Sequence, residues 1–180
     1  MFFNALSSGA ASRKVVRACL LALAAGLAAL TPLRAYADCT DAPGPTVDWQ
    51  RCYQDGRDFA GADLSKAQLR DASFTRAILE KTNFAGADAF GAKFYSARMA
   101  GVSFEGARVA EADFSEADLT GAIFRKTDMR GAKLISANLH DADLSGANLR
   151  GADLFRAQLG GALWTDGKTR CAEGSVGQCN

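Results

Sequence analysis

A single histidine, His140, is the residue in this chain with the widest catalytic use. It is the only histidine among 180 residues, so neither a cluster of histidine metal ligands nor a Ser-His-Asp triad with alternative partners can be assembled. Catalytic and metal sites need several convergent groups. We therefore predict that His140 is a solvated side chain, and that the chain is not an enzyme and holds no metal or cofactor.

Cysteines are the second group that could support chemistry. Cys19 lies in an apolar N-terminal run, and Cys39, Cys52, Cys171 and Cys179 follow it. In an exported chain, an even number of cysteines indicates two disulfides, here with three possible connectivities. A zinc site is the alternative, and it would need four thiolates to converge from the two ends of the sequence.

The N-terminus has the pattern of a Sec-type signal peptide. Basic residues at 13 to 17 precede a 13-residue apolar run at 18–30, and Ala35-Tyr36-Ala37 is a small-residue cleavage site. The apolar run is shorter than the roughly 20 residues that span a bilayer. The residues before Cys39 also do not fit a lipoprotein signal. The sequence predicts cleavage after Ala37, a periplasmic or secreted protein, and no membrane anchor after cleavage.

The net charge depends on this cleavage. The whole chain has 21 basic and 20 acidic residues, whereas the part after Ala37 has 17 basic and 20 acidic residues, a net charge of −3. A mildly acidic protein lacks the positive surface that binds nucleic acid or anionic lipid.

One spacing organises residues 57–164. From Phe59 to Trp164 every fifth residue is apolar, at 22 positions without interruption, and Ala stands two residues earlier at 18 of them. A helix would scatter such residues around its axis, since five residues advance about 500°. A strand would send them alternately to both faces, and no strand runs for a hundred residues. The chain must instead turn at each repeat and point both residues toward a common axis, which predicts a solenoid.

The repeated units resemble those of the pentapeptide-repeat family. Examples are Ala62-Asp63-Leu64, Ala117-Asp118-Leu119 and Ala147-Asn148-Leu149, and the resemblance covers about 108 of the 180 residues. It implies an all-β solenoid, a right-handed quadrilateral β-helix with four units per coil, in which the large residue and the preceding small residue face inward. The 22 units then make about five and a half coils, and the rod is roughly 25 Å long at ~4.8 Å per coil.

With four units per coil, residues twenty apart stack in columns. The carboxylates before the large residues occupy the family's outward position, where turn and interstrand roles explain them. Two outward columns alternate in charge, which we interpret as a contribution to register and solubility. The inward columns include Phe74, Phe94 and Phe114, and Phe84, Phe104 and Phe124; the outward ones are Ser73, Lys93, Asp113, Lys133 and Asp153, and Gln68, Asp88, Arg108, Asp128 and Asn148.

Two short segments outside the period, 38–56 and 165–180, are predicted to cap the rod. A rod of that length holds its ends too far apart for a disulfide, which needs Cα atoms within about 7 Å. We therefore predict Cys39 paired with Cys52 and Cys171 paired with Cys179, and no zinc site. Trp49 and Trp164 are expected to cover the first and last coils.

These features favour a non-catalytic, exported structural or protein-binding scaffold, either a monomer or a weak dimer, with a protein partner and no nucleic acid. Some pentapeptide-repeat proteins imitate DNA and bind topoisomerases, but such mimicry needs an acidic face. Residues 57–164 contain 14 basic and 14 acidic residues, and an exported chain does not meet gyrase. An uncharacterised enzyme is the other alternative, and no set of convergent groups supports it.

One outward column is unusually apolar and is the candidate partner-binding site. It contains Tyr95, Ile135 and Phe155, and Phe90 lies on the adjacent side of the coil that holds Tyr95. Outward positions elsewhere are mostly Gly, Ser, Ala or charged. We predict that Phe90, Tyr95, Ile135 and Phe155 contact the partner.

Overall fold

The computed structural model describes residues 38–180, and the predicted signal peptide with its cleavage position lies outside them. Within this part of the chain there is no helix long and apolar enough to cross a membrane.

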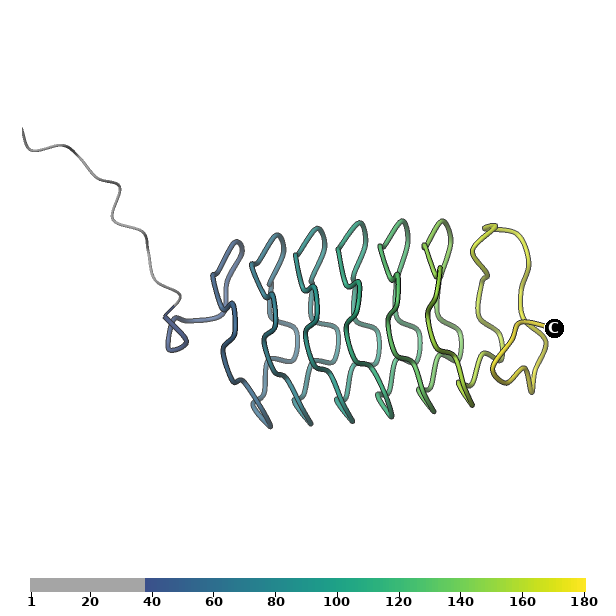
Figure 1. Cartoon of the computed structure of the whole chain (residues 1–180), viewed down its shortest axis with the longest axis horizontal. Helices are drawn as coiled ribbons and strands as arrows, with labels where there is room; N and C mark the ends of the chain where they lie inside the picture. Colours follow the sequence, from purple (N-terminus) through teal and green to yellow (C-terminus); the bar gives the residue numbers. More distant parts are fainter. Residues whose placement is uncertain (1–37) are drawn as a thin grey trace, which may run out of the picture. The chain divides into compact units, whose positions relative to one another are not determined.

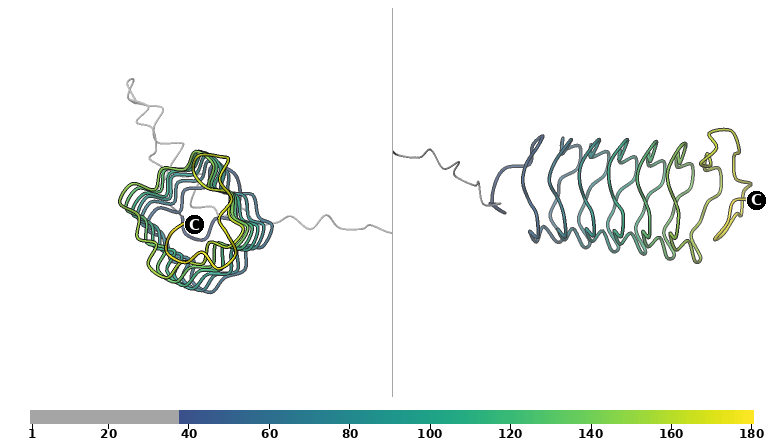
Figure 2. Two further views of the ribbon diagram at one scale, coloured as in Figure 1. Left: turned by 90° about the vertical axis from the view of Figure 1, so that its right-hand side faces the viewer. Right: turned by 45° about the horizontal axis from the view of Figure 1, so that its top comes forward.

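The described chain winds into stacked coils of twenty residues (Figure 1). Parallel backbone bridges join each outward residue to the residue twenty positions later, from Asp48 with Gln68 to Asp143 with Leu163. Each coil has four sides, as the end-on view shows (Figure 2). A side contributes one bridge residue rather than a longer strand, because the chain turns two residues later. The predicted coil of four pentapeptides is confirmed.

Each corner is a tight turn whose second residue has left-handed backbone geometry. Ala62 closes one such turn by donating its N–H to the carbonyl of Phe59 at 2.9 Å, and Gly61 between them has a φ of 69°. Glycine adopts this geometry without steric cost. Thirteen non-glycine residues of the described chain nevertheless have φ values between 52° and 63°. Bonding to the neighbouring coils therefore overrides the local preference at those corners.

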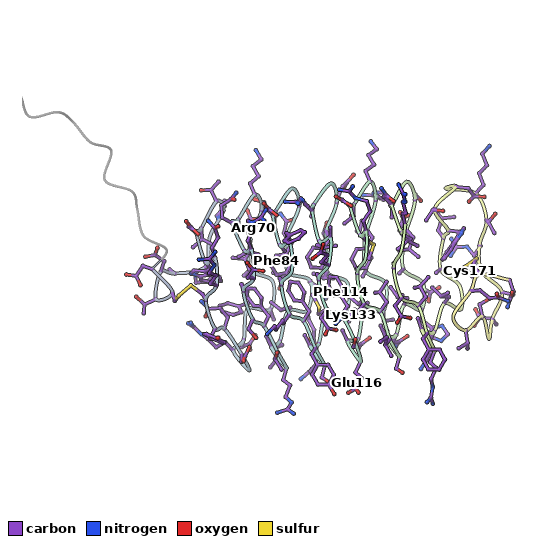
Figure 3. All side chains as sticks on the ribbon, viewed as in Figure 1. Arg70, Phe84, Phe114, Glu116, Lys133 and Cys171 are labelled. Atoms are coloured by element: carbon purple, nitrogen blue, oxygen red, sulfur yellow. A yellow bond between two sulfur atoms is a disulfide. The ribbon has the colours of Figure 1, made fainter. Side chains whose placement is uncertain are left out.

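Stacked aromatic rings fill much of the interior. The ring centroids of Phe74 and Phe94 are 5.4 Å apart, those of Phe94 and Phe114 are 4.9 Å apart, and both pairs are nearly parallel. Phe94 also meets Phe104 of the neighbouring column edge to face at 5.7 Å. Figure 3 shows Phe84 and Phe114 within the coils. Both predicted aromatic columns are confirmed, including the second one with Phe84, Phe104 and Phe124.

Two threonines replace the usual inward alanine without leaving a polar group unpaired. The hydroxyl of Thr82 donates to the carbonyl of Phe59 at 2.8 Å, and that of Thr127 donates to the carbonyl of Phe104 at 2.7 Å. Both side chains are buried. Because a buried hydroxyl is costly only when it is unbonded, the pattern tolerates these exceptions.

The first coil starts earlier than the segment assigned to the repeats. Asp48 already bridges Gln68, and Trp49 is fully buried with its ring 5.3 Å from that of Phe59. Residues 48–163, at twenty per coil, make nearly six coils. The repeat geometry therefore extends into residues 38–56, and Trp49 lies within the first coil.

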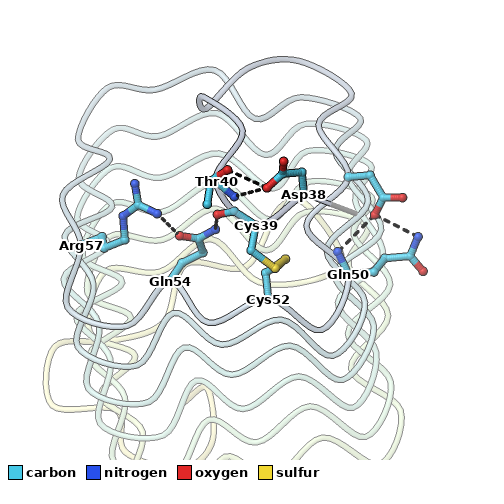
Figure 4. Close-up of a disulfide and its surroundings, with 8 residues drawn as sticks. Asp38, Cys39, Thr40, Gln50, Cys52, Gln54 and Arg57 are labelled. Carbon is cyan, nitrogen blue, oxygen red and sulfur yellow. Dashed lines mark hydrogen bonds between the residues drawn. A yellow bond between two sulfur atoms is a disulfide. The ribbon is translucent and has the colours of Figure 1, made fainter. Parts of the chain in front are cut away.

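A buried glutamine occupies the next inward position. Gln54 is fully buried, its Nε2 donates to the carbonyl of Cys39 at 3.1 Å, and its Oε1 accepts from Arg57 at 2.5 Å (Figure 4). Cys52, in the position that alanine takes elsewhere, is bonded to Cys39 with the Cα atoms 5.4 Å apart. This predicted disulfide is confirmed, and it fixes the backbone carbonyl that Gln54 needs.

The C-terminal segment folds back on the last coil. Antiparallel bridges join Gln158 to Val176 and Leu163 to Arg170. The predicted disulfide between Cys171 and Cys179 is confirmed, with the Cα atoms 4.8 Å apart. Part of the edge of the last coil is thereby paired in the antiparallel sense, which prevents another parallel coil from stacking there. Trp164 is half-buried, and its backbone N–H donates to the carbonyl of Thr169 in this segment at 2.7 Å.

Candidate functional site

The structure places His140 on an exposed corner. Its imidazole lies over Gly160 of the next coil, and the carboxylate of Glu173 is beside the same glycine. Within residues 38–180, no group of three or more His, Cys, Asp or Glu side chains is arranged to hold a metal ion.

The outward aspartates serve the backbone. Asp63 Oδ1 accepts the N–H of Ser65 at 3.0 Å, which lowers the pKa of that carboxyl. The pKa of Asp128 is also lowered, chiefly by a side-chain hydrogen bond from Arg130. A general acid or base active near neutral pH would need the opposite shift. The same bond to the N–H two residues later is made by Asp48, Asp58, Asp88, Asp113, Asp118, Asp143 and Asp153.

The candidate partner-binding residues lie along the two edges of one side of the coil. We call this side the Lys93 face. Its outward residues form one column, in which each residue is joined by a backbone bridge to the next coil. Lys133 of this face is seen in Figure 3 between Arg70 and Glu116, which belong to its two corners. The outward residues of the Lys93 face are Tyr53, Ser73, Lys93, Asp113, Lys133 and Asp153.

One corner of the face, the Tyr95 edge, consists of Thr75, Tyr95, Ser115, Ile135 and Phe155. Phe155 is 66% exposed, and Ile135 is half-buried in the coil directly before it, since Ser136 N–H bonds to the Phe155 carbonyl. Tyr95 is also half-buried, and its hydroxyl donates to Glu116 Oε2 at 2.8 Å, one coil later. The ring of Tyr95 therefore extends along the rod. Phe155 is one of three exposed large apolar side chains in residues 38–180, together with Tyr53 and Val176.

The other corner, the Phe90 edge, consists of Arg70, Phe90, Ala110, Arg130 and Arg150. The guanidinium groups of Arg70 and Arg108 lie 4.8 and 4.6 Å from the centre of the Phe90 ring. Asp88 bonds to Arg70 at 3.3 Å and lies 3.6 Å from Arg108. Phe90 is therefore held between two cations and is separated from Tyr95 by Lys93. The sequence analysis did not predict that either arginine contacts Phe90; their spacing of about one coil on either side of Phe90 is the signal that could have indicated it.

The charges of the Lys93 face are not neutralised within the chain. Six ion pairs occur in the described residues, and none involves Lys93, Asp113, Lys133 or Asp153. Opposite charges stack one coil apart in both columns, as predicted, but a close ion pair forms between Asp88 and Arg108 and none forms along the Lys93 face. Asp113 and Asp153 accept the N–H groups of Ser115 and Phe155, both at 2.9 Å. The face consequently presents four charges in alternating order to the outside.

Comparisons with known proteins concern the repeats. No curated protein matches the chain in sequence. Among solved structures, QnrB1, a plasmid-mediated fluoroquinolone resistance protein, is 24% identical over 63% of this chain, with a TM-score of 0.34; the match spans 63% of that protein's length. Rfr23 from the cyanobacterium Cyanothece 51142 is 28% identical, over 64% of this chain and 82% of that one, with a TM-score of 0.39. HetL from Nostoc sp. strain PCC 7120, involved in heterocyst differentiation regulation, is 27% identical, over 69% and 75%, with a TM-score of 0.28.

A family model provides the assignment. The model described as "Pentapeptide repeats" matches 8 copies over residues 58–94, 67–106, 97–134, 112–151 and 132–163. These matches cover more than half of the chain and coincide with the twenty-residue coils. This chain belongs to the pentapeptide-repeat family.

Proposed function

We propose that the protein is a non-catalytic, exported scaffold that binds a protein partner through the Lys93 face and its Tyr95 edge. The observation that carries this proposal is the pair of half-buried Ile135 and exposed Phe155 beside four charges that have no ion pair in the described chain. Apolar residues next to free, well-spaced charges suit a protein surface, since the apolar contacts supply affinity and the charges fix orientation.

Two disulfides support a location outside the reducing cytoplasm. Both cysteine pairs of the described chain are bonded, and such bonds persist in oxidising compartments. The signal peptide predicted at residues 1–37 agrees with this proposal. N-terminal sequencing of the protein recovered from the periplasm or medium tests it, and the expected first residue is Asp38. An intact N-terminus on a cytoplasmic protein would contradict export.

Cross-linking in the producing cell tests the binding site. The Ile135→Ser/Phe155→Ser variant should reduce the recovery of cross-linked partner at least tenfold while leaving circular dichroism and melting nearly unchanged. Ile123→Ser is a matched control, because Ile123 is also a half-buried outward residue but lies half a coil away, on the opposite side. If recovery is undiminished, or is diminished equally by Ile123→Ser, the Lys93 face is not the binding site.

A further inference from the structure

The charge order along the Lys93 face is complementary to its own reverse. Lys93, Asp113, Lys133 and Asp153 follow one another in adjacent coils. Read from the other end, the column runs Asp, Lys, Asp, Lys. A second copy lying antiparallel, with a two-fold axis midway between the coils of Asp113 and Lys133, would therefore set Lys93 opposite Asp153 and Asp113 opposite Lys133. Symmetry makes each of these pairs twice, giving four ion pairs in all.

The same two-fold axis also places the Tyr95 edges of the two copies against each other. Residues at equal distance from the axis face each other, so Tyr95 lies opposite Phe155 of the second copy, and Ser115 lies opposite Ile135. The most exposed apolar side chain of the edge thus meets its aromatic counterpart, a pairing that contributes beyond the area it buries. Small Ser115, only 9% exposed, gives Ile135 of the other copy room to approach.

The Phe90 edge does not add to this match. The axis sets Phe90 opposite Arg150 of the second copy, and Ala110 opposite Arg130. Because Arg70 and Arg108 already lie over the Phe90 ring, Arg150 would bring a third cation to that ring. Like charges at this edge weaken the pairing, which rests on the ion pairs and on the Tyr95 edge.

The other three sides lack this property. On the side of Asp88 and Arg108, those two charges already pair within the chain at 3.6 Å. On the next side, Arg98 is paired with Glu80. The side opposite the Lys93 face has two acidic outward residues and no basic one in its column of Asp63, Asn83, Ser103, Ile123, Asp143 and Leu163. Within residues 38–180, four consecutive alternating charges without ion pairs occur on the Lys93 face alone.

We propose that the partner of the Lys93 face is a second copy of this chain, bound antiparallel about that two-fold axis; the inference rests on the proposed function and names its partner. Four coils at ~4.8 Å and a five-residue side give about 300 Å² per copy. That is less than half of the area of a standard interface, about 800 Å² per partner. The dimer is therefore weak, and it dissociates as salt screens its ion pairs.

Sedimentation equilibrium of the purified, exported protein at low ionic strength tests this inference. We expect reversible dimerisation at high micromolar to millimolar concentration, weakened at least tenfold in 0.5 M NaCl. The variants Lys93→Asp/Lys133→Asp and Asp113→Lys/Asp153→Lys each make the column uniform in sign and should not dimerise alone. An equimolar mixture should associate again, because an acidic column then faces a basic one.

Circular dichroism establishes that both variants are folded. If Asp113→Lys/Asp153→Lys does not fold, the salt dependence of the natural protein and its loss of dimerisation on Phe155→Ser are the remaining tests. A natural protein that is monomeric at millimolar concentration, or a mixture that does not associate, overturns self-association. If the Ile135→Ser/Phe155→Ser variant then still loses a cross-linked partner of another mass in cells, the proposed function stands and only the identity of the partner is wrong.

Discussion

Asp71 lies over Gly91, the residue twenty positions later, so closely that a methyl group on Gly91 would be 2.7 Å from Asp71 Oδ1. A similar relationship recurs around the rod, where a longer side chain at one left-handed corner covers a glycine in the next coil. Gly91 therefore serves two purposes, positive φ and space for the preceding side chain. Asp141 over Gly161 is a second tight pair. In the pairs Lys66 over Gly86, Lys81 over Gly101, Glu111 over Gly131 and Lys126 over Gly146, a methyl group would make ordinary contact at 3.5 to 3.7 Å.

The two purposes can be separated by substituting two glycines of equal φ. Gly91 and Gly106 have φ values of 66° and 65°, but no atom lies within 4 Å of a Cβ placed on Gly106. Both Gly→Ala variants incur the left-handed cost of roughly 1 kcal/mol. Gly91→Ala should lose up to about 1 kcal/mol more in urea denaturation, because Asp71 must move. Adding Asp71→Ala should remove that excess, and an excess that persists would mean that the side chain is not its cause.

The aromatic columns are expected to dominate stability. Phe104 stacks between Phe84 and Phe124 with centroids 4.8 and 5.4 Å away. Phe104→Ala should lower the free energy of unfolding by roughly 3 to 5 kcal/mol, and Phe104→Leu by much less, because it leaves a smaller cavity. Asp118→Ala on the exterior should cost less than about 1 kcal/mol. Equal losses in chemical denaturation for Phe104→Ala and Asp118→Ala would be inconsistent with the inward column.

The interior could be predicted from the sequence because one period controls it. A spacing of five residues sets which side chains face the axis, and a coil of twenty then determines every stack, including Phe74 on Phe94. The start of the first coil could not be predicted in this way. Gln54 is polar at an inward position, and its burial depends on the carbonyl of Cys39 and on Arg57. The Cys39 carbonyl belongs to the N-terminal segment outside the five-residue repeat, so the repeat pattern cannot predict its contact with Gln54.

The candidate site was predicted only in outline. Counting by twenty placed Tyr95, Ile135 and Phe155 on one edge, since backbone register alone decides that. It did not place Arg70 and Arg108 over the ring of Phe90, because that arrangement depends on side-chain conformations reaching across neighbouring coils.

The C-terminal turn should be sensitive to acid. Hydrogen bonds from the hydroxyl of Thr169, and from the backbone N–H groups of Thr169 and Lys168, lower the pKa of Asp166 to about 2. Its unfolded value is about 3.9, so its contribution to stability is complete above about pH 4 and is lost as the pH falls toward 2. The melting temperature should therefore fall less between pH 6 and pH 2.5 in the Asp166→Asn variant than in the natural protein. An unchanged difference would show that Asp166 does not contribute.

The two disulfides should differ in importance, although their closed loops are short in both cases. Cys39 and Cys52 are 13 residues apart, Cys171 and Cys179 are 8 apart, and each bond restricts the unfolded chain by about 2 to 3 kcal/mol. Cys39→Ala/Cys52→Ala should nevertheless cost more than Cys171→Ala/Cys179→Ala. The reason is Gln54, whose buried amide depends on the Cys39 carbonyl that the first disulfide holds in place.

Replacement of this glutamine checks that reason. A buried amide left unpaired costs about 1 to 3 kcal/mol, so Gln54→Leu should recover stability in the Cys39→Ala/Cys52→Ala background. In the intact protein the same substitution removes a bonded amide and frees Arg57, and it should be neutral or destabilising. Urea denaturation of the four proteins in this cycle gives the coupling between the disulfide and Gln54 directly. A coupling of zero would mean that the cap stabilises the rod only through loop closure, whereas we expect it to act also by supplying the acceptor that lets the first coil bury a polar side chain.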